Sequence, residues 1–316
     1  MQTFIIKRLL LAIPIMVLTS IVVFTLMRIL PGDPVLVLIG QTQSEISDEQ
    51  IAQLRREYGL DQPIYIQYLR WAAKAASGDF GRSIQSRQPV MDILRPRVLP
   101  TLQIGFLAWV LAFSIAIPAA IVAAVYPNTW KDWFGSLCAL FGAAMPYFLL
   151  GGVLIYFVAL RLRWLPASGY VSPFVDPLQS LRLSILPAIT LGVGLAAVTM
   201  RQARGSLIEV LQKEYITTAR AKGLRNDRVI MRHAFKNGML PVVTLLGIQL
   251  GNLLGGAVIT ETIFSIPGMG RLLVDAIFSR DYPIIQAVVL ITGLAVVLAN
   301  LIVDILYAYL DPRIRY

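Results

Sequence analysis

EVLQKEYITTARAKGLRNDRVIMRHAFKNGMLP, residues 209–241, is a basic and partly polar stretch between two strongly apolar segments. Residues 201–238 carry nine Lys or Arg against three Asp or Glu. The composition predicts a helix over 207–222 that ends at Gly223, because glycine commonly closes a helix. A second helix is predicted over 226–236, with Asn226 as its N-cap. A simple polar loop needs no capped helices, so we expect a rigid two-helix elbow that contacts a cytoplasmic partner.

The whole chain has the composition of a membrane protein. Of its 316 residues, 57% are hydrophobic, and the mean hydropathy is +0.69, above that of soluble domains. A membrane-spanning helix needs about 20 apolar residues. Six helical spans are predicted: 9–29, 101–125, 135–160, 185–200, 239–260 and 284–309. The fourth is short, and an earlier start within 178–184 is an alternative.

The first span is predicted to be retained, because its apolar run is too long for a signal peptide and no small-residue cleavage site follows it. Pro118, Pro146 and Pro187 lie in or beside other spans and are predicted positions for helix kinks.

The distribution of charge predicts the orientation. Loops rich in Lys and Arg remain in the cytoplasm, which places 201–238 and both termini inside a bacterial or archaeal plasma membrane. The net charge of +10 follows this topology, and it indicates membrane lipid and no nucleic acid as a partner. The predicted organisation is an N-terminal tail and first span over 1–30, an outer segment over 31–100, and a membrane core over 101–316.

The outer segment is predicted to be ordered. The turn Pro31-Gly-Asp-Pro34 ends the first span, and Ser47 is a predicted cap for a helix that follows. Residues around Tyr65 and Trp71 predict a second amphipathic helix with aromatic side chains at the membrane interface. Residues 78–100 form a return loop in this prediction. Whether the segment docks a partner or is a plain surface loop stays open.

Two places in the spans are predicted to matter for a pathway. Gly247, Gly251 and Gly255 share one helix face and allow close helix approach, with Gln249 and Asn252 nearby. Either this face packs helices within the chain, or it lines a path that Gln249 or Asn252 faces.

The second place is the segment from Glu261 to Gly270. Pro267-Gly268 predicts a turn, followed by a helix too short to cross the membrane. The segment is therefore expected beside the path, as an outer gate formed by Glu261, Phe264, Pro267 and Gly268, with Glu261 buried against a partner.

The stretch EYITTARAKG (214–223) with RHAFKNGMLP (232–241) resembles the EAA loop of permease subunits of ATP-binding-cassette (ABC) importers. It is most similar to the dipeptide/oligopeptide branch, which includes peptide, glutathione and nickel systems. Further stretches extend the resemblance over almost the whole chain: PGDP (31–34), YGLDQP (58–63), GDFG (78–81), ETIFSIPGMG (261–270), RDYP (280–283) and DPRIR (311–315). Thr217 and Thr218 replace the consensus Glu and first Ala. Either Glu214 or Asp227 then takes the salt-bridge role of that Glu.

The resemblance implies a type I importer permease that pairs with a homologous permease to form a pathway. It also implies two ATPase domains inside and a periplasmic or lipid-anchored substrate-binding protein outside. The residues implied to couple to the ATPase are Glu214, Tyr215, Thr217, Thr218, Ala219, Arg220, Ala221, Gly223 and Asp227. ATP and Mg²⁺ would belong to the ATPase domains, because this chain has no G-x-x-x-x-G-K-[ST] loop and is not expected to be an enzyme. The implied cargo is a peptide, with glutathione, a nickel chelate or a small glycan as alternatives.

Two other classes of function would leave different marks in the sequence. A secondary transporter predicts paired intramembrane acids or matching broken helices, whereas the spans hold the isolated Asp304 and show no clear repeat. A metalloprotease needs several ligands and an H-E-x-x-H motif, and His233 is the single histidine. No metal site is therefore expected in this chain.

Overall fold

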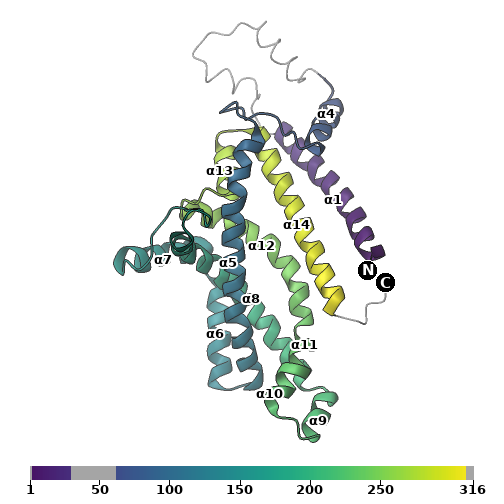
Figure 1. Cartoon of the computed structure of the whole chain (residues 1–316), viewed down its shortest axis with the longest axis vertical. Helices are drawn as coiled ribbons and strands as arrows, with labels where there is room; N and C mark the ends of the chain where they lie inside the picture. The colour runs from purple at the N-terminus through teal and green to yellow at the C-terminus, as the bar shows by residue number, and fades with distance from the viewer. Residues whose placement is uncertain (1, 30–61, 311–316) are drawn as a thin grey trace. The chain divides into compact units, whose positions relative to one another are not determined.

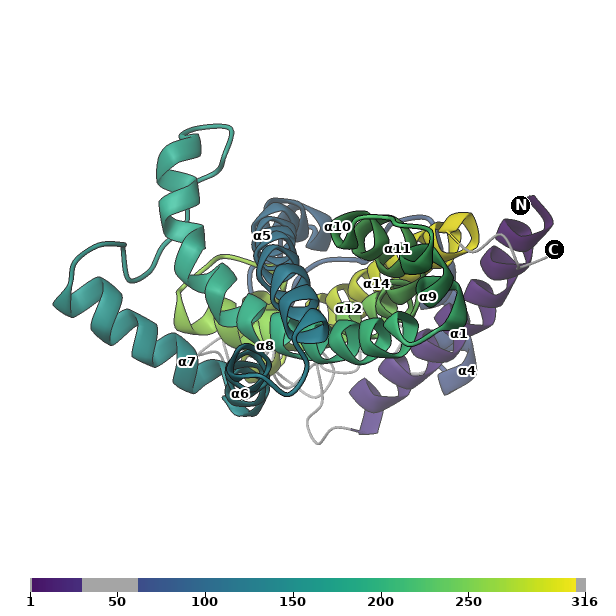
Figure 2. The ribbon, with the colours of Figure 1, turned by 90° about the horizontal axis from the view of Figure 1, so that it is seen from below.

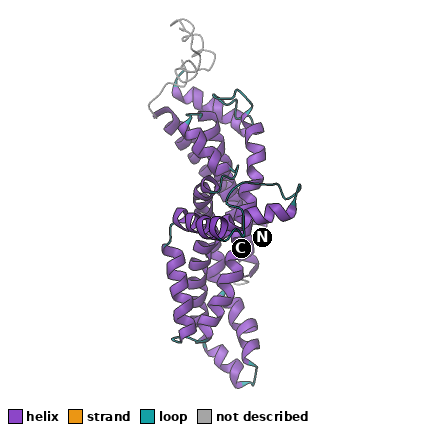
Figure 3. Ribbon diagram, turned by 90° about the vertical axis from the view of Figure 1, so that its left-hand side faces the viewer, coloured by secondary structure: helices purple, strands orange, loops and turns teal. Residues whose placement is uncertain are grey.

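The computed structural model describes residues 2–29 and 62–310, and there the chain is helical apart from loops and one bridge between Arg82 and Pro89 (Figure 3). The predicted all-α class is confirmed. The elements are labelled in Figure 1 where space permits: α1 Gln2–Ile29, α4 Ile64–Ala76, α5 Val90–Val125, α6 Trp130–Ala144, α7 Tyr147–Leu154, η1 Ile155–Arg161, α8 Pro177–Leu211, α9 Glu214–Ala221, α10 Asn226–Arg228, η2 Val229–Ala234, α11 Phe235–Gly238, α12 Leu240–Ile263, α13 Met269–Phe278 and α14 Tyr282–Leu310.

Four described helices are long and apolar enough to cross a membrane: Ile6–Ile29, Val90–Val125, Pro177–Leu211 and Tyr282–Ile305. A fifth span is reached if the bent pair α6 and α7–η1 is counted as one. The predicted span 239–260 falls on α12, whose 24 residues extend about 36 Å. Within α12, Leu253–Ile263 is a continuous apolar stretch of described residues. Six spans were predicted, and four or five spans meet the length and hydropathy criteria among the described residues.

The predicted span over 135–160 is not one straight helix, and the kink predicted at Pro146 is confirmed. Two helices, Trp130–Ala144 and Tyr147–Arg161, meet at 104°. Met145 has an extended backbone with ψ 119°, the conformation that the following Pro146 imposes on its neighbour. Proline also has no N–H for the helix ladder, so α7 leaves in a new direction (Figure 1). Pro187, by contrast, lies inside the continuous helix α8.

The predicted starts of two other spans also change. α5 begins at Val90 instead of 101, so the predicted return loop 78–100 is helical in its second half. The Val90 N–H bonds the Gly81 carbonyl at 3.0 Å, where the loop ends. α8 begins at Pro177, which confirms the earlier start considered for the fourth span. Asp176 caps α8 by accepting the Gln179 N–H at 3.0 Å, as N-cap residues do.

The described chain divides into two compact parts. One holds residues 100–270 and 298–310, and the other holds 2–29, 62–99 and 271–297. In the second part, α4 confirms the predicted amphipathic helix. Its Tyr68 hydroxyl lies 2.9 Å from Ser20 Oγ on α1, and the Phe24 ring lies 5.6 Å from Tyr68 and 5.5 Å from Trp71. These α4 aromatic rings pack on α1.

The first part has a core of small side chains. α5 contributes a row of buried alanines at a spacing of four: Ala108, Ala112, Ala116 and Ala120. A Cβ added to Gly192 of α8 would lie 3.0 Å from the Ala108 carbonyl oxygen. The backbones of α5 and α8 therefore approach closely, as small residues permit in membrane helices. Seen from below, the helices of the elbow gather near one end of α8 (Figure 2).

Several predictions fall outside the described residues. These are the Pro31-Gly-Asp-Pro34 turn, the helix capped by Ser47, and the motif over 311–315. The predicted organisation into 1–30, 31–100 and 101–316 stays a prediction.

Candidate coupling site

The elbow begins with a break that the sequence analysis missed. The predicted helix over 207–222 is two helices, because α8 ends at Leu211 and α9 begins at Glu214. Lys213 has an extended backbone (φ −71°, ψ 147°), and its N–H bonds the Val210 carbonyl at 3.1 Å to close α8. Gln212 and Lys213 are good helix formers, so propensity alone does not predict this break.

Gly223 ends α9 as predicted. Its φ of +78° is in the left-handed region, which glycine adopts without strain. The Gly223 N–H bonds the Arg220 carbonyl at 2.9 Å, a pattern typical of a helix C-terminus. A Cβ added here would meet no atom within 4 Å. Within the described chain, Gly223 is therefore required by its backbone conformation and not by packing.

The second arm differs slightly from the prediction. Asn226 is the first residue of α10, and Arg225 occupies the cap position without a side-chain hydrogen bond. The Arg225 guanidinium instead pairs with Asp227, with Nη2 3.1 Å from Oδ2 and Nε 3.3 Å from Oδ1. Desolvation opposes the charged Asp227 carboxylate. The Arg228 N–H and Arg225 nevertheless hold the pKa of Asp227 below its usual value.

A small hydrophobic cluster joins the two arms. Its buried members come from the end of α8, from α9, and from η2: Val210, Ile216, Ala219, Val229 and Ala234. Asn237 Nδ2 donates to the Tyr215 hydroxyl at 3.1 Å, which ties α11 to α9. A Cβ added to Gly238 would lie 2.7 Å from Leu207 Cδ2. The elbow is therefore folded onto the end of α8.

The predicted coupling residues divide into two groups. Eight are exposed: Glu214, Tyr215, Thr217, Thr218, Arg220, Ala221, Gly223 and Asp227. Ala219 is buried at 7% exposure, so it supports the elbow from within. Sequence analysis overlooked the buried Ile216, although its spacing of three from Ala219 marks one helix face.

Glu214 and Asp227 differ in their surroundings. Asp227 is paired with Arg225. The Glu214 carboxylate is exposed and makes no hydrogen bond or ion pair with the described residues. Its backbone carbonyl accepts from Thr218 Oγ1 at 3.1 Å. Glu214 is thus the carboxylate that is available to a partner.

The α12 face was predicted either to pack helices within the chain or to line a path, and its residues differ in which of these they fit. Gln249 is buried, and its Nε2 donates to Thr199 Oγ1 of α8 at 3.0 Å, so it packs helices together. Gly251 and Gly255 are exposed, and an added Cβ at either meets nothing within 4 Å. Packing within the described chain does not occupy this face. The predictions for Gly247 and for the side chain of Asn252 fall outside the part of the chain that the structure describes.

Three of the four predicted outer-gate residues are buried: Glu261, Phe264 and Gly268. Glu261 is fully buried and accepts from Thr101 Oγ1 at 2.5 Å, which confirms that it has a partner. Thr101 in turn accepts the Met269 N–H at 2.8 Å. Phe264 is buried, and its carbonyl accepts the Gly169 N–H at 3.0 Å. Gly268 is buried against Glu261, and Pro267 is half-buried.

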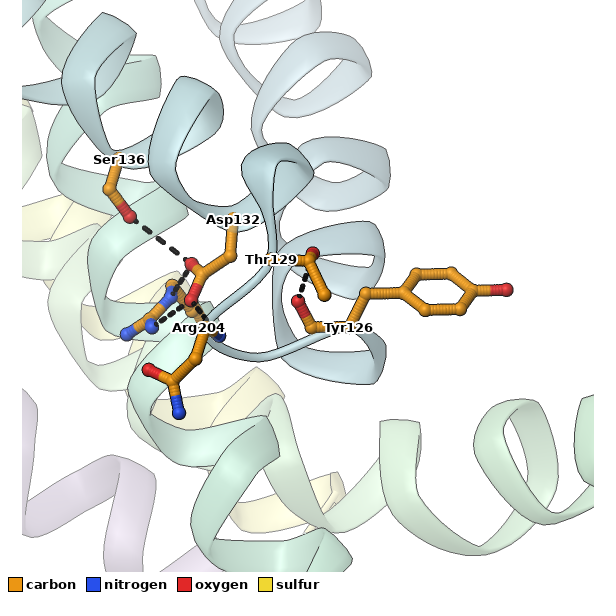
Figure 4. A network of polar contacts seen from close by, with 6 residues as sticks. Tyr126, Thr129, Asp132, Ser136 and Arg204 are labelled. Atoms are coloured by element: carbon orange, nitrogen blue, oxygen red, sulfur yellow. Dashed lines mark hydrogen bonds and ion pairs between the residues drawn. The ribbon is translucent and has the colours of Figure 1, made fainter.

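A polar network around the buried Asp132 links α6 to α8, and the sequence analysis overlooked it (Figure 4). The Arg204 guanidinium binds Asp132 with both arms, Nε to Oδ1 at 2.5 Å and Nη2 to Oδ2 at 2.6 Å. The available signal was an acidic residue beside the apolar run of α6, because such a residue usually has a partner.

Comparison with known proteins identifies the family. Residues 116–316 match the model of the binding-protein-dependent transport system inner membrane component. Residues 1–105 match the N-terminal model of such membrane components. The chain belongs to this family. It is therefore a multi-pass inner-membrane permease whose transport system includes a substrate-binding protein.

Individual relatives and a solved structure support the same family assignment. The permease is 42% identical over 317 residues to the glutathione transport system permease protein GsiC of Escherichia coli K12, covering all of both chains. It is 42% identical over 318 residues to GsiC of Salmonella paratyphi A, again with full coverage. A MetNI methionine ABC transporter chain, in an inward-facing conformation, matches with a TM-score of 0.59 at 17% identity, covering 71% of this permease and 99% of that chain. The predicted ABC importer permease, with a type I fold, is confirmed.

Proposed function

We propose that this permease forms half of the pathway of an ATP-driven importer for small peptides, glutathione among them. The observation that carries the proposal is the 42% identity over the full chain to permeases named for glutathione transport, because glutathione is itself a small peptide. A homologous second permease supplies the other half of the pathway. The open face at Gly251 and Gly255 supports this arrangement, since a second helix can approach glycine closely.

The elbow is the contact with the ATPase. Its exposed residues from Glu214 to Asp227 present a surface, and the cluster around Ile216 fixes their positions. Glu214 takes the role of the consensus glutamate, because its carboxylate pairs with no described residue whereas Asp227 is paired with Arg225. ATP and Mg²⁺ bind in the ATPase domains, and this chain gates the path. Both termini and the elbow are cytoplasmic, because the loop over 201–238 carries most of the local positive charge.

The test is reconstitution. The permease is co-expressed with its neighbouring genes, purified through a tag, and placed in liposomes that contain ATP. Uptake of radiolabelled dipeptides, tripeptides and glutathione is measured with and without the binding protein. The proposal expects recovery of a second permease and an ATPase, with uptake that requires both ATP and binding protein. Peptide transport by this chain alone without ATP would overturn it, and uptake restricted to a nickel chelate or a glycan would overturn the peptide assignment.

A further inference from the structure

The ion pair between Asp132 and Arg204 is enclosed on several sides. The Asp132 side chain is 5% exposed. Besides the two arms of Arg204, Asp132 accepts the Asn128 N–H at 3.0 Å and Ser136 Oγ at 3.3 Å. The same carboxylate therefore binds the α5–α6 turn, the first turns of α6, and α8 (Figure 4). Two parallel guanidinium–carboxylate bonds fix orientation as well as distance.

The position of the pair along the two helices matters. Arg204 lies two turns before the end of α8 at Leu211, and α9 of the elbow follows after Gln212 and Lys213. Asp132 lies in the first turn of α6. The pair thus joins α6 to α8 at the end of α8 that carries the elbow.

The two helices also interlock along their length. A Cβ added to Gly135 would lie 2.9 Å from Met200 Cε, and one added to Gly142 would lie 3.0 Å from Val193 Cγ1 and 3.3 Å from Ala197 Cβ. Close packing resists separation of α6 from α8. It resists sliding and rotation of the two helices less, and directional bonds oppose those motions. The Asp132–Arg204 pair supplies such bonds at one end.

We propose that Asp132 and Arg204 are positioning residues that make α6 move together with α8 when the elbow is displaced. The displacement then reaches the sharp break at Met145-Pro146, where α6 gives way to α7. This inference rests on the proposed contact of the elbow with an ATPase. An ordinary exposed ion pair would not serve this purpose, since such pairs contribute little and tolerate rearrangement.

The first test is Arg204→Lys in the complete reconstituted importer. Lysine keeps the charge but loses the two-armed geometry. The measured quantity is the number of substrate molecules imported per ATP hydrolysed. Because lysine cannot bind Asp132 with two arms, we expect this ratio to fall about tenfold, while ATP hydrolysis continues. Arg201→Lys, one turn away on α8 and exposed, is the matched control with an unchanged ratio.

A purely structural role gives a different result. Loss of folded complex lowers import and hydrolysis together and leaves their ratio unchanged, so that outcome would overturn the inference. Failure of unmodified importer to couple ATP to uptake would instead overturn the proposed function. The two failures are therefore distinguishable.

The second test does not depend on how a variant of the pair folds. Gly142→Cys with Ala197→Cys, in a Cys138→Ser background, places the two Cβ atoms 3.3 Å apart across α6 and α8. This is slightly closer than the about 3.5–4.5 Å of a disulfide, so a small adjustment lets the bond form. If the helices move together, oxidation leaves import intact, and it restores the ratio when Arg204→Lys is also present. Import abolished by oxidation and recovered by a reductant would mean that α6 must slide on α8, and would overturn the inference.

Discussion

A Cβ added to Gly268 would overlap the carboxyl group of the fully buried Glu261. The turn at Pro267-Gly268 is thus closed around a carboxylate that α12 contributes. Thr101 of α5 completes the arrangement, since it donates to Glu261 and accepts from Met269 N–H. One buried acid therefore connects α5 and α12 with the start of α13.

Gly268→Ala is expected to destabilise the permease by about 1–3 kcal/mol, the usual penalty for overpacking. Either the turn or Glu261 must move to accept the methyl group. The measurement is the thermal midpoint of the detergent-purified complex. Gly152→Ala is the matched control, because its added Cβ meets nothing within 4 Å. Equal midpoints for Gly268→Ala and the unmodified complex would contradict the described geometry.

Thr101→Val is expected to cost about 1–3 kcal/mol, because it removes a donor to a buried carboxylate and leaves the Met269 N–H without that acceptor. Thr101→Ser retains the hydroxyl and should lose much less. Thermal midpoints of the two variants, compared in parallel, measure the difference. If valine and serine behave alike, the hydroxyl does not stabilise the turn.

Gly223→Asp is expected to leave membrane insertion intact while weakening ATPase recovery and uptake. The added side chain enters a space that no described residue occupies and that the proposed partner would fill. Co-purification of the ATPase and its activity are the measurements. Gly81→Asp is the control, because Gly81 has a similar φ of +77° and equally open surroundings outside the elbow. Normal transport by Gly223→Asp would count heavily against the elbow as the docking site.

Gly251→Leu is expected to preserve the fold of the chain but to reduce recovery of the second permease. Its added side chain begins in open space, so little within this chain opposes it. Gly256→Leu should instead disrupt the chain itself, because a Cβ there already lies 2.9 Å from Leu191 and Tyr147. Size-exclusion profiles and co-purification separate the two effects. Unchanged assembly of Gly251→Leu would mean that this face meets lipid.

Hydropathy predicted the long helices well, because a helix that crosses a membrane must have a long run of apolar residues. It placed the start of α5 too late, since Arg95, Pro96 and Arg97 lower the hydropathy of a stretch that is nevertheless helical. Hydropathy alone does not show the break at Met145-Pro146, which was indicated only by the proline itself. Proline is tolerated inside spans such as α8, and whether it bends a helix depends on surrounding packing.

The features of the site that depend on neighbouring residues in the sequence could be predicted. The positive φ at Gly223 follows from a glycine that closes a polar helix, and the exposure of most elbow residues follows from their polarity. The partners of Gln249 and Glu261 lie on other helices, at Thr199 and Thr101. Nothing in the sequence around either residue indicates those pairings, because they depend on how distant helices align.

The small hydrophobic cluster inside the elbow has a consequence for the strength of binding. Ile216, Ala219, Val229 and Ala234 already bury one another in this chain, so the loop has a defined conformation before any contact forms. Ordering a mobile loop during association costs conformational entropy, which lowers affinity. A preorganised loop avoids that cost. In the proposed contact with an ATPase, the packed loop would also pass a displacement to α8 without first changing its own conformation.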